Sequence, residues 1–236
     1  MPGALWLLPV ALGDTPWENC LPATTRAVAC RLTHFVAENA KTARAEFKRI
    51  GHPLPLRELA IEQMPDTLTP ADIERLLEPL VAGHDLGLMS EAGCPAVADP
   101  GALLVRRAHE LGITVKPLVG PSSLLLALMG SGLEGQRFAF HGYLPARDPE
   151  RGRCIVALED ESARNRQTQI FIETPYRNSA LFNALLTGCR PKTRVCLATD
   201  LSLPGESIAT RRVSEWKRGA MPDLDKRPTV FLLLAD

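Results

Sequence analysis

The stretch DLGLMSEAGCPAVADPGALLVRRAHELGITVKPLVG (85–120) decides the fold, because a strand, a loop, a helix and a second strand follow one another in it. DLGLMS (85–90) is short and apolar, as a buried strand is. Asp99 is then the expected N-cap of a helix, Pro100 its first residue and Gly112 the residue that ends it. Two strands joined in this way run parallel with a right-handed crossover, so the stretch predicts a parallel α/β sheet.

The sequence on both sides continues this alternation. Before this stretch, we expect strands over 4–10, 33–38 and 58–64 and helices over 39–51 and 69–83. Directly after it, we expect a helix over 120–132. Further along, we expect strands over 137–145 and 168–174, helices over 150–164 and 175–188, and three final strands over 193–200, 206–216 and 227–235. The final strands have no helix between them and should pair antiparallel. The sequence therefore predicts an α/β fold with a mostly parallel N-terminal sheet in domain 1–119 and a mixed C-terminal sheet in domain 120–236.

Loops of small and polar residues follow several of these strands. They are PVALGD (9–14), SEAGCPAVADPG (90–101), VGPSS (119–123) and ETPY (173–176). Ligands of open parallel sheets bind beyond the carboxyl ends of the strands, where glycine and alanine let a ligand approach the backbone. The loops therefore favour a small-ligand cleft, with ordinary α/β turns as the alternative. Glu91 either binds a ligand hydroxyl or amine or is solvated, Asp99 is at least a helix cap, and Cys94 is expected to pack rather than act as a nucleophile.

The charge balance limits what the chain binds. The net charge is +0 and the pI about 7.0, whereas a protein that binds phosphate backbones usually has a basic excess. Any RNA contact must therefore come from a local patch. The candidates, which are solvated surface residues in the alternative interpretation, form two clusters: Lys41, Arg44, Lys48, Arg49 and Arg211, Arg212, Lys217, Arg218.

Six cysteines form neither a CxxC pair nor a zinc spacing, so we expect free thiols in a reducing cytoplasm and no metal. The apolar start MPGALWLLPVALGD lacks a basic region and should be a strand rather than a signal peptide. No run reaches the roughly 18 apolar residues that a membrane span needs, so we expect no membrane association.

The sequence GSGLEG (130–135) matches the glycine pattern of dinucleotide-binding loops. That pattern requires a strand before it and a helix after it. Here a helix is expected before it and a strand after it, so the glycines are expected to end a helix. A nicotinamide enzyme is therefore the least favoured interpretation.

Four segments in order resemble the tetrapyrrole-methylase superfamily of S-adenosylmethionine-dependent methyltransferases. They are SEAGCPAVADPG, VGPSSLLLALMGSGL, FAFHGYLP and IFIETPYRN, and they span about residues 85–180. Weaker similarity at LLPVALGD and KRPTVFLL extends the resemblance over nearly the whole chain. The branch that it resembles most is the ribosomal RNA small-subunit cytidine 2′-O-methyltransferase type.

This resemblance implies a homodimer of two-domain subunits, with S-adenosylmethionine in a cleft between the domains. The residues that it implies for donor binding are Pro9, Ser90, Glu91, Gly93, Val97, Asp99, Pro121, Ser122, Ser123, Thr174 and Thr229. A hydroxyl acceptor gains from a general base, for which Glu173 is the candidate, and Tyr176 and Arg177 are candidates for positioning the acceptor. The acceptor is ribosomal RNA, another RNA or a small heterocycle.

The first loop departs from the family pattern. PVALGD (9–14) is one residue shorter and has Ala11 where a glycine is expected. The alternative function is therefore a regulatory or interaction protein that binds S-adenosylmethionine in the same fold without transferring its methyl group.

Overall fold

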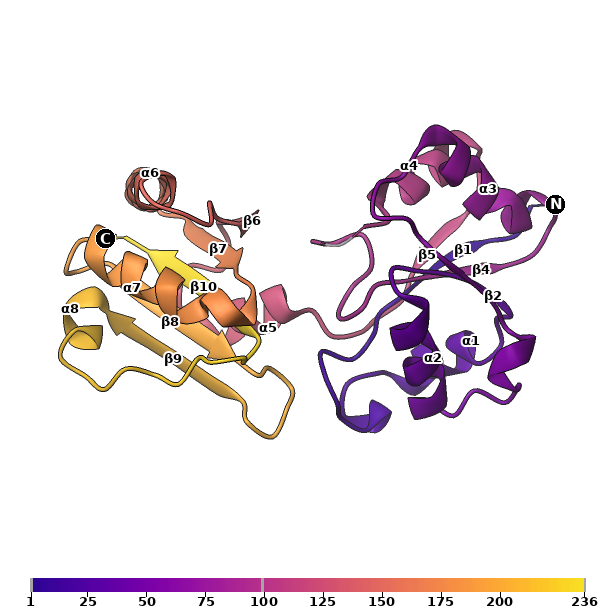
Figure 1. The fold of residues 1–236 in the computed structure, drawn as a ribbon, viewed down its shortest axis with the longest axis horizontal. Coiled ribbons are helices and arrows are strands. Elements are labelled where there is room, and N and C mark those ends of the chain that lie inside the picture. Colours follow the sequence, from indigo (N-terminus) through magenta and orange to yellow (C-terminus); the bar gives the residue numbers. More distant parts are fainter. Residues whose placement is uncertain (1, 99, 236) are drawn as a thin grey trace. The chain divides into compact units, whose positions relative to one another are not determined.

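The computed structural model describes residues 2–98 and 100–235, and the chain divides into two compact units, with the boundary between Ser122 and Ser123 (Figure 1). The strands of the first unit are β1 (Leu5–Leu8), β2 (His34–Ala37), β3 (Ala60–Gln63), β4 (Leu86–Met89) and β5 (Val115–Pro117). Its α-helices are α1 (Ala23–Ala29), α2 (Ala40–Arg49), α3 (Pro70–Val81) and α4 (Ala102–Glu110), and its 3-10 turns are η1 (Trp17–Asn19) and η2 (Leu56–Glu58).

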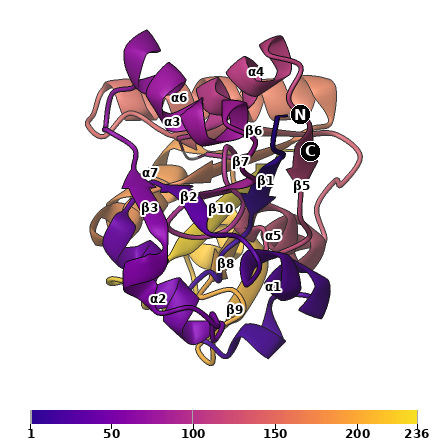
Figure 2. The same ribbon diagram turned by 90° about the vertical axis from the view of Figure 1, so that its right-hand side faces the viewer.

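The first sheet is entirely parallel, in the order β3-β2-β4-β1-β5. Helices α3 and α4 cover one face and α1 and α2 the other (Figure 2). Phe35 and Phe47 pack together under α2, while Leu76 and Leu104 belong to the core on the α3–α4 face. Because all five strands run the same way, the loops after β1, β4 and β5 leave the sheet at one edge.

The second unit contains β6 (Phe138–Tyr143), β7 (Thr168–Ile172), β8 (Arg194–Thr199), β9 (Ser207–Arg212) and β10 (Thr229–Leu234). Its helices are α5 (Ser123–Ser131), α6 (Glu150–Asn165), η3 (Pro175–Arg177), α7 (Asn178–Gly188) and α8 (Val213–Trp216). The sheet order is β6-β7-β10-β8-β9, and only the β6–β7 pair is parallel. Side chains of α6, α7 and α8 share one core with the sheet, and α5 packs against β8, β9 and β10.

These sheets confirm the predicted α/β fold class, including the antiparallel pairing of the last strands. Strand β1 lies between β4 and β5, so the two strands of the stretch that decides the fold are parallel without being neighbours. GSGLEG ends α5 and precedes β6, as the order of the predicted elements requires.

Two local predictions are wrong. Helix α4 begins at Ala102 rather than at Pro100, and its N-cap is Gly101 with φ 121°. Asp99, the predicted cap and donor-binding residue, lies outside the described residues. The strand predicted over 206–216 ends at Arg212, where the Glu215 carboxylate accepts a hydrogen bond from the Arg212 N–H and opens α8.

Helix α1 was not predicted from the sequence, and it lacks a side-chain N-cap. Within the described residues, no helix combines the length and the apolar character that crossing a membrane demands.

Candidate functional site at the edge of the first sheet

The loops that follow β1 and β4 are joined by two backbone hydrogen bonds. Val10 N–H donates to the Gly93 carbonyl at 2.9 Å, and Gly93 N–H donates to the Val10 carbonyl at 3.1 Å. The loop after β5 packs against the first of them, since a Cβ added to Gly120 would lie 2.2 Å from the Cβ of Pro9. Three segments distant in sequence therefore form one continuous edge, which includes the predicted donor-binding residues Pro9 and Gly93.

The loop after β4 has an unusual backbone. Gly93 has φ 74°, and Ala96 and Ala98 have φ 65° and 67°. Left-handed backbone costs an alanine about 1–2 kcal/mol. Such strain persists only where surrounding structure imposes it, and it is concentrated at binding and catalytic sites. The small side chains of this loop leave its backbone groups accessible to a ligand.

The predicted residues of this loop differ in exposure. Ser90 is buried and its hydroxyl donates to the Ala92 carbonyl at 3.1 Å. Glu91 is exposed, and its backbone N–H donates to a carboxylate oxygen of Glu38 at 3.1 Å. Val97 is also exposed. Glu38, which directly follows β2, thus ties a fourth strand end to the same edge.

The loop after β5 contributes Pro121 and Ser122. Pro121 is buried, and its carbonyl accepts a hydrogen bond from the Cys94 thiol at 3.4 Å. The Thr25 hydroxyl on α1 donates to the Val119 carbonyl at 2.7 Å and fixes the start of the same loop. Ser122 is half-buried and is the last residue of the first unit, while Ser123 opens α5 in the second.

The remaining predicted residues lie in the second unit. The Glu173 side chain is 1% exposed, and its Oε1 accepts hydrogen bonds from Thr174 N–H at 2.6 Å and from Nε and Nη2 of Arg177 at 3.0 and 2.7 Å. Arg177 stays 44% exposed and Tyr176 79% exposed. A buried carboxylate thus holds an exposed guanidinium in a fixed orientation.

Thr229 begins β10 and is buried. Its hydroxyl donates to the Arg227 carbonyl at 3.0 Å and lies 3.3 Å from the Thr199 hydroxyl. The Asn178 amide also donates to the Arg227 carbonyl, at 2.7 Å, so the start of α7 holds the turn before β10.

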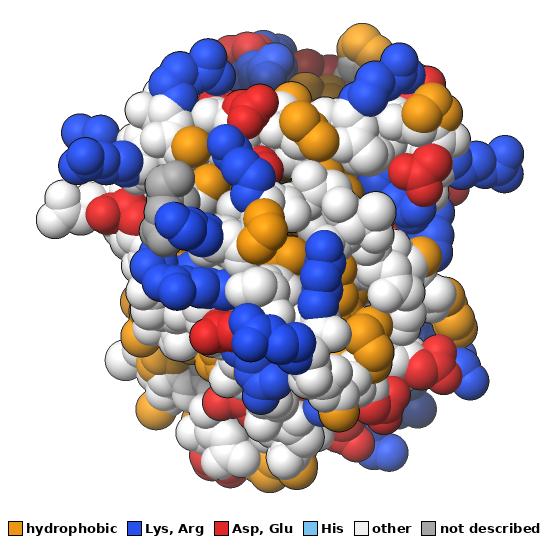
Figure 3. Space-filling model, turned by 90° about the vertical axis from the view of Figure 1, so that its left-hand side faces the viewer, with side chains coloured by type: hydrophobic (Ala, Val, Ile, Leu, Met, Phe, Trp, Pro, Cys, Tyr) orange, Lys and Arg blue, Asp and Glu red, His pale blue; other side chains and the backbone are white. Residues whose placement is uncertain are grey.

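The second unit has the basic excess. Residues 123–236 contain sixteen Lys and Arg against thirteen Asp and Glu, while the rest of the chain has eleven against fourteen. Figure 3 shows blue cationic side chains spread over the face at this end of the molecule. Of the predicted basic candidates, Arg49 is not available for a ligand, because it is paired with Glu46 and donates to the Thr15 carbonyl at 2.8 Å.

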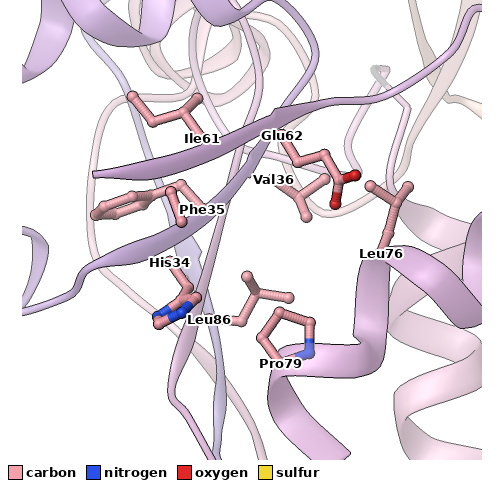
Figure 4. Close-up of a pocket in the computed structure, with 9 residues that line it drawn as sticks. His34, Phe35, Val36, Ile61, Glu62, Leu76, Pro79 and Leu86 are labelled. Atoms are coloured by element: carbon pink, nitrogen blue, oxygen red, sulfur yellow. The ribbon is translucent and has the colours of Figure 1, made fainter. Parts of the chain in front are cut away.

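A hollow of about 190 Å³ lies away from the predicted residues, among β2, β3, β4 and α3 (Figure 4). Its lining is mostly apolar, and Glu62 in it is paired with Arg75. Burial lowers the pKa of His34 at its rim, and the nearby His84, whose ring stacks at 4.7 Å, lowers that pKa further. A second hollow of about 230 Å³, between β8, β9 and the 222–227 turn, includes Arg227, which is paired with Asp200.

The described residues contain no group of three or more His, Cys, Asp or Glu side chains placed to hold a metal ion.

Two residues of the site were not identified from the sequence. Gly120 was included in the predicted ligand loop VGPSS but was not singled out, although its close approach to Pro9 requires a glycine. Glu38 was not singled out, since nothing in its sequence context shows that it reaches the β4 loop.

Curated proteins match the chain over its whole length. Ribosomal RNA small subunit methyltransferase I of Xylella fastidiosa (strain Temecula1) is 30% identical over 233 residues, which cover 99% of this chain and 81% of the relative. The chain belongs to the ribosomal RNA small subunit methyltransferase I family. This result confirms the predicted superfamily and makes the chain a methyltransferase by family.

Two other members of this family match over part of their length. The protein of the same name from Pseudomonas aeruginosa is 36% identical over 141 residues, or 60% of this chain and 49% of the relative. The one from Escherichia coli O157:H7 is 33% identical over 163 residues, or 69% of this chain and 56% of the relative. These two alignments thus span about half the length of each relative.

The fold is also that of a solved methyltransferase. A crystal structure of the methyltransferase CobJ superposes with a TM-score of 0.65 over 99% of this chain and 94% of that one, at 18% identity. No family model matches the sequence.

Proposed function

We propose that this protein transfers a methyl group from S-adenosylmethionine to a ribose 2′-hydroxyl of small-subunit ribosomal RNA. The observation that carries the proposal is the edge of the first sheet, where the β1, β4 and β5 loops are tied together through Val10, Gly93 and Gly120. The name and the substrate of the relatives support the class of acceptor.

The residues at this edge fit the methyl donor. Its amino-acid and ribose parts need hydrogen-bonding groups, which the accessible backbone around Ala96 and Ala98 and the exposed Glu91 offer. When bound, the donor supplies a methyl group already activated on a sulfonium. The proposed binding residues are those of the sequence analysis: Pro9, Ser90, Glu91, Gly93, Val97, Asp99, Pro121, Ser122, Ser123, Thr174 and Thr229.

Orientation is the main task left to the protein, since aligned reactants alone gain up to about 7–11 kcal/mol. Arg177 and Tyr176, exposed beside the end of β7, are proposed to position the acceptor. Glu173 was the candidate base. Because its Oε1 already accepts three hydrogen bonds and the side chain is buried, we assign it first the role of holding Arg177.

The alternative function is donor binding without transfer, which the shortened first loop motivates. The structure describes that loop as part of the joined edge, with Ala11 buried. A homodimer and a cytoplasmic location belong to the same proposal, and the six cysteines are thiols rather than disulfides.

The test uses small ribosomal subunits purified from a strain that lacks this protein. Tritiated methyl groups from S-adenosylmethionine should enter the RNA, and nuclease digestion should release a 2′-O-methylated nucleotide. In parallel, calorimetric titration with S-adenosylmethionine measures donor binding. Donor binding without incorporation would favour the alternative, and absence of both would refute the proposal.

A further inference from the structure

The chain has two tyrosines, and both are exposed in the second unit. Tyr143 is 58% exposed at the end of β6, and Tyr176 is 79% exposed in η3, directly after β7. Strands β6 and β7 are parallel, and Tyr143 is the register partner of Ile172, the last residue of β7. The two rings therefore belong to the same edge of the second sheet.

The backbone of β6 changes just before Tyr143. The pairing of β6 with β7 shifts register between Phe140 and Tyr143, and Gly142 has φ 64°. A bulge of this kind redirects the side chain that follows it, and bulges are common next to functional sites. Any side chain at Gly142 would be strained by that φ, while the space around its Cβ position is open.

An exposed arginine follows each tyrosine. Arg147 lies in the loop that leaves β6, and Arg177 in the turn that leaves β7. Arg177 is fixed by the buried Glu173 carboxylate and is still 44% exposed, so its guanidinium keeps donors toward solvent. This edge thus presents two aromatic rings and two cations, on the unit with the basic excess.

We propose that Tyr143 and Tyr176 stack on unpaired bases of the acceptor RNA while Arg147 and Arg177 contact its phosphates. Proteins recognise single-stranded RNA by stacking bases on aromatic side chains beside cationic groups. Two exposed aromatic rings beside two exposed arginines, on the unit with the basic excess, supply both kinds of contact. The inference deepens the proposed function, because it assigns the acceptor to this edge and predicts an unpaired target nucleotide.

The test measures RNA binding directly, by fluorescence anisotropy of a short fluorescein-labelled single-stranded RNA. Removing one stacking ring costs roughly 1–3 kcal/mol, so Tyr143→Ala and Tyr176→Ala should each weaken binding by about 5- to 150-fold. Tyr143→Phe and Tyr176→Phe should bind like the wild type, since the ring is kept. Phe138→Ala is the matched control: Phe138 is 42% exposed at the other end of β6 and should not change the affinity.

The inference would be overturned by no RNA binding by the wild type, by unchanged affinity in both alanine variants, or by dissociation of an oligomer in sedimentation of Tyr143→Ala. The last would make this edge a contact between copies of the chain. Methyl transfer to small subunits separates the two proposals. Transfer that continues in the double alanine variant with an unchanged KM for the subunit refutes the stacking edge, whereas RNA binding by the wild type without transfer refutes the proposed function alone.

Discussion

Val10 and Gly93 exchange two backbone hydrogen bonds, at 2.9 and 3.1 Å, although 83 positions separate them in the sequence. Both residues lie beyond the ends of their strands, β1 and β4, which pair in parallel, and the antiparallel bridge between them ties the two following loops together. It requires Gly93 at φ 74°, where an alanine is strained.

We expect Gly93→Ala to lower the free energy of unfolding by about 1–2 kcal/mol and to weaken S-adenosylmethionine binding by about tenfold, as the backbone relaxes and the bridge lengthens. Gly112→Ala is the control, because Gly112 has φ 67° at the end of α4 with nothing near its Cβ position. It should lose similar stability, measured by urea unfolding, and keep its affinity for the donor in calorimetry. Equal losses of affinity would show that the bridge does not matter to binding.

The contact between Glu173 and Arg177 predicts a mild effect of Glu173→Gln. A glutamine keeps an acceptor oxygen for Arg177, so kcat should fall less than about tenfold and the pH profile should keep its shape. Removal of a general base would instead lower kcat by about 10²–10⁴-fold. Steady-state methyl transfer at several pH values distinguishes these outcomes, with Arg177→Lys as the variant that should raise KM for the subunit.

The stacked pair His34 and His84 predicts a loss of stability in acid. Burial and His84 lower the pKa of His34 in the folded protein, so below the unfolded value of about 6.5 the unfolded chain binds more protons. The melting temperature should therefore fall as the pH drops through about 6.5, and this fall should be smaller in His34→Gln. His109 lies on the exposed side of α4, so His109→Gln should show the same fall in melting temperature as the wild type. An identical fall in all three proteins would contradict this assignment.

The buried thiol of Cys189 should resist alkylation. Burial raises the pKa of Cys189 to about 12, with a smaller contribution from Glu159, so the thiolate that reacts is scarce at pH 8. Iodoacetamide should label the half-buried Cys154 well before Cys189 in the native protein, and both after unfolding in guanidinium. Peptide mass spectrometry follows each site, and equal native rates would refute the expected protection.

Much of the fold could be predicted from local signals. The alternation of apolar strands with capped helices predicted the α/β class, and in the structure Thr69 caps α3 and forms a capping box with Asp72. The start of α4 could not be predicted in the same way. Asp99-Pro100 has the chemistry of a helix start, but the backbone begins the helix at Ala102 after Gly101. Local preference was outweighed by the path that the loop follows from β4.

The candidate site, like the fold, could be predicted from the sequence only in part. The sequence by itself determined which segments are strands, which loops are small enough to admit a ligand, and through its motifs the methyltransferase family. Only the tertiary structure decided that Val10 meets Gly93, that Gly120 rests on Pro9, and that Tyr143 lies opposite Ile172. Strand order and register bring these residues together, and they depend on long-range packing that local sequence patterns do not encode.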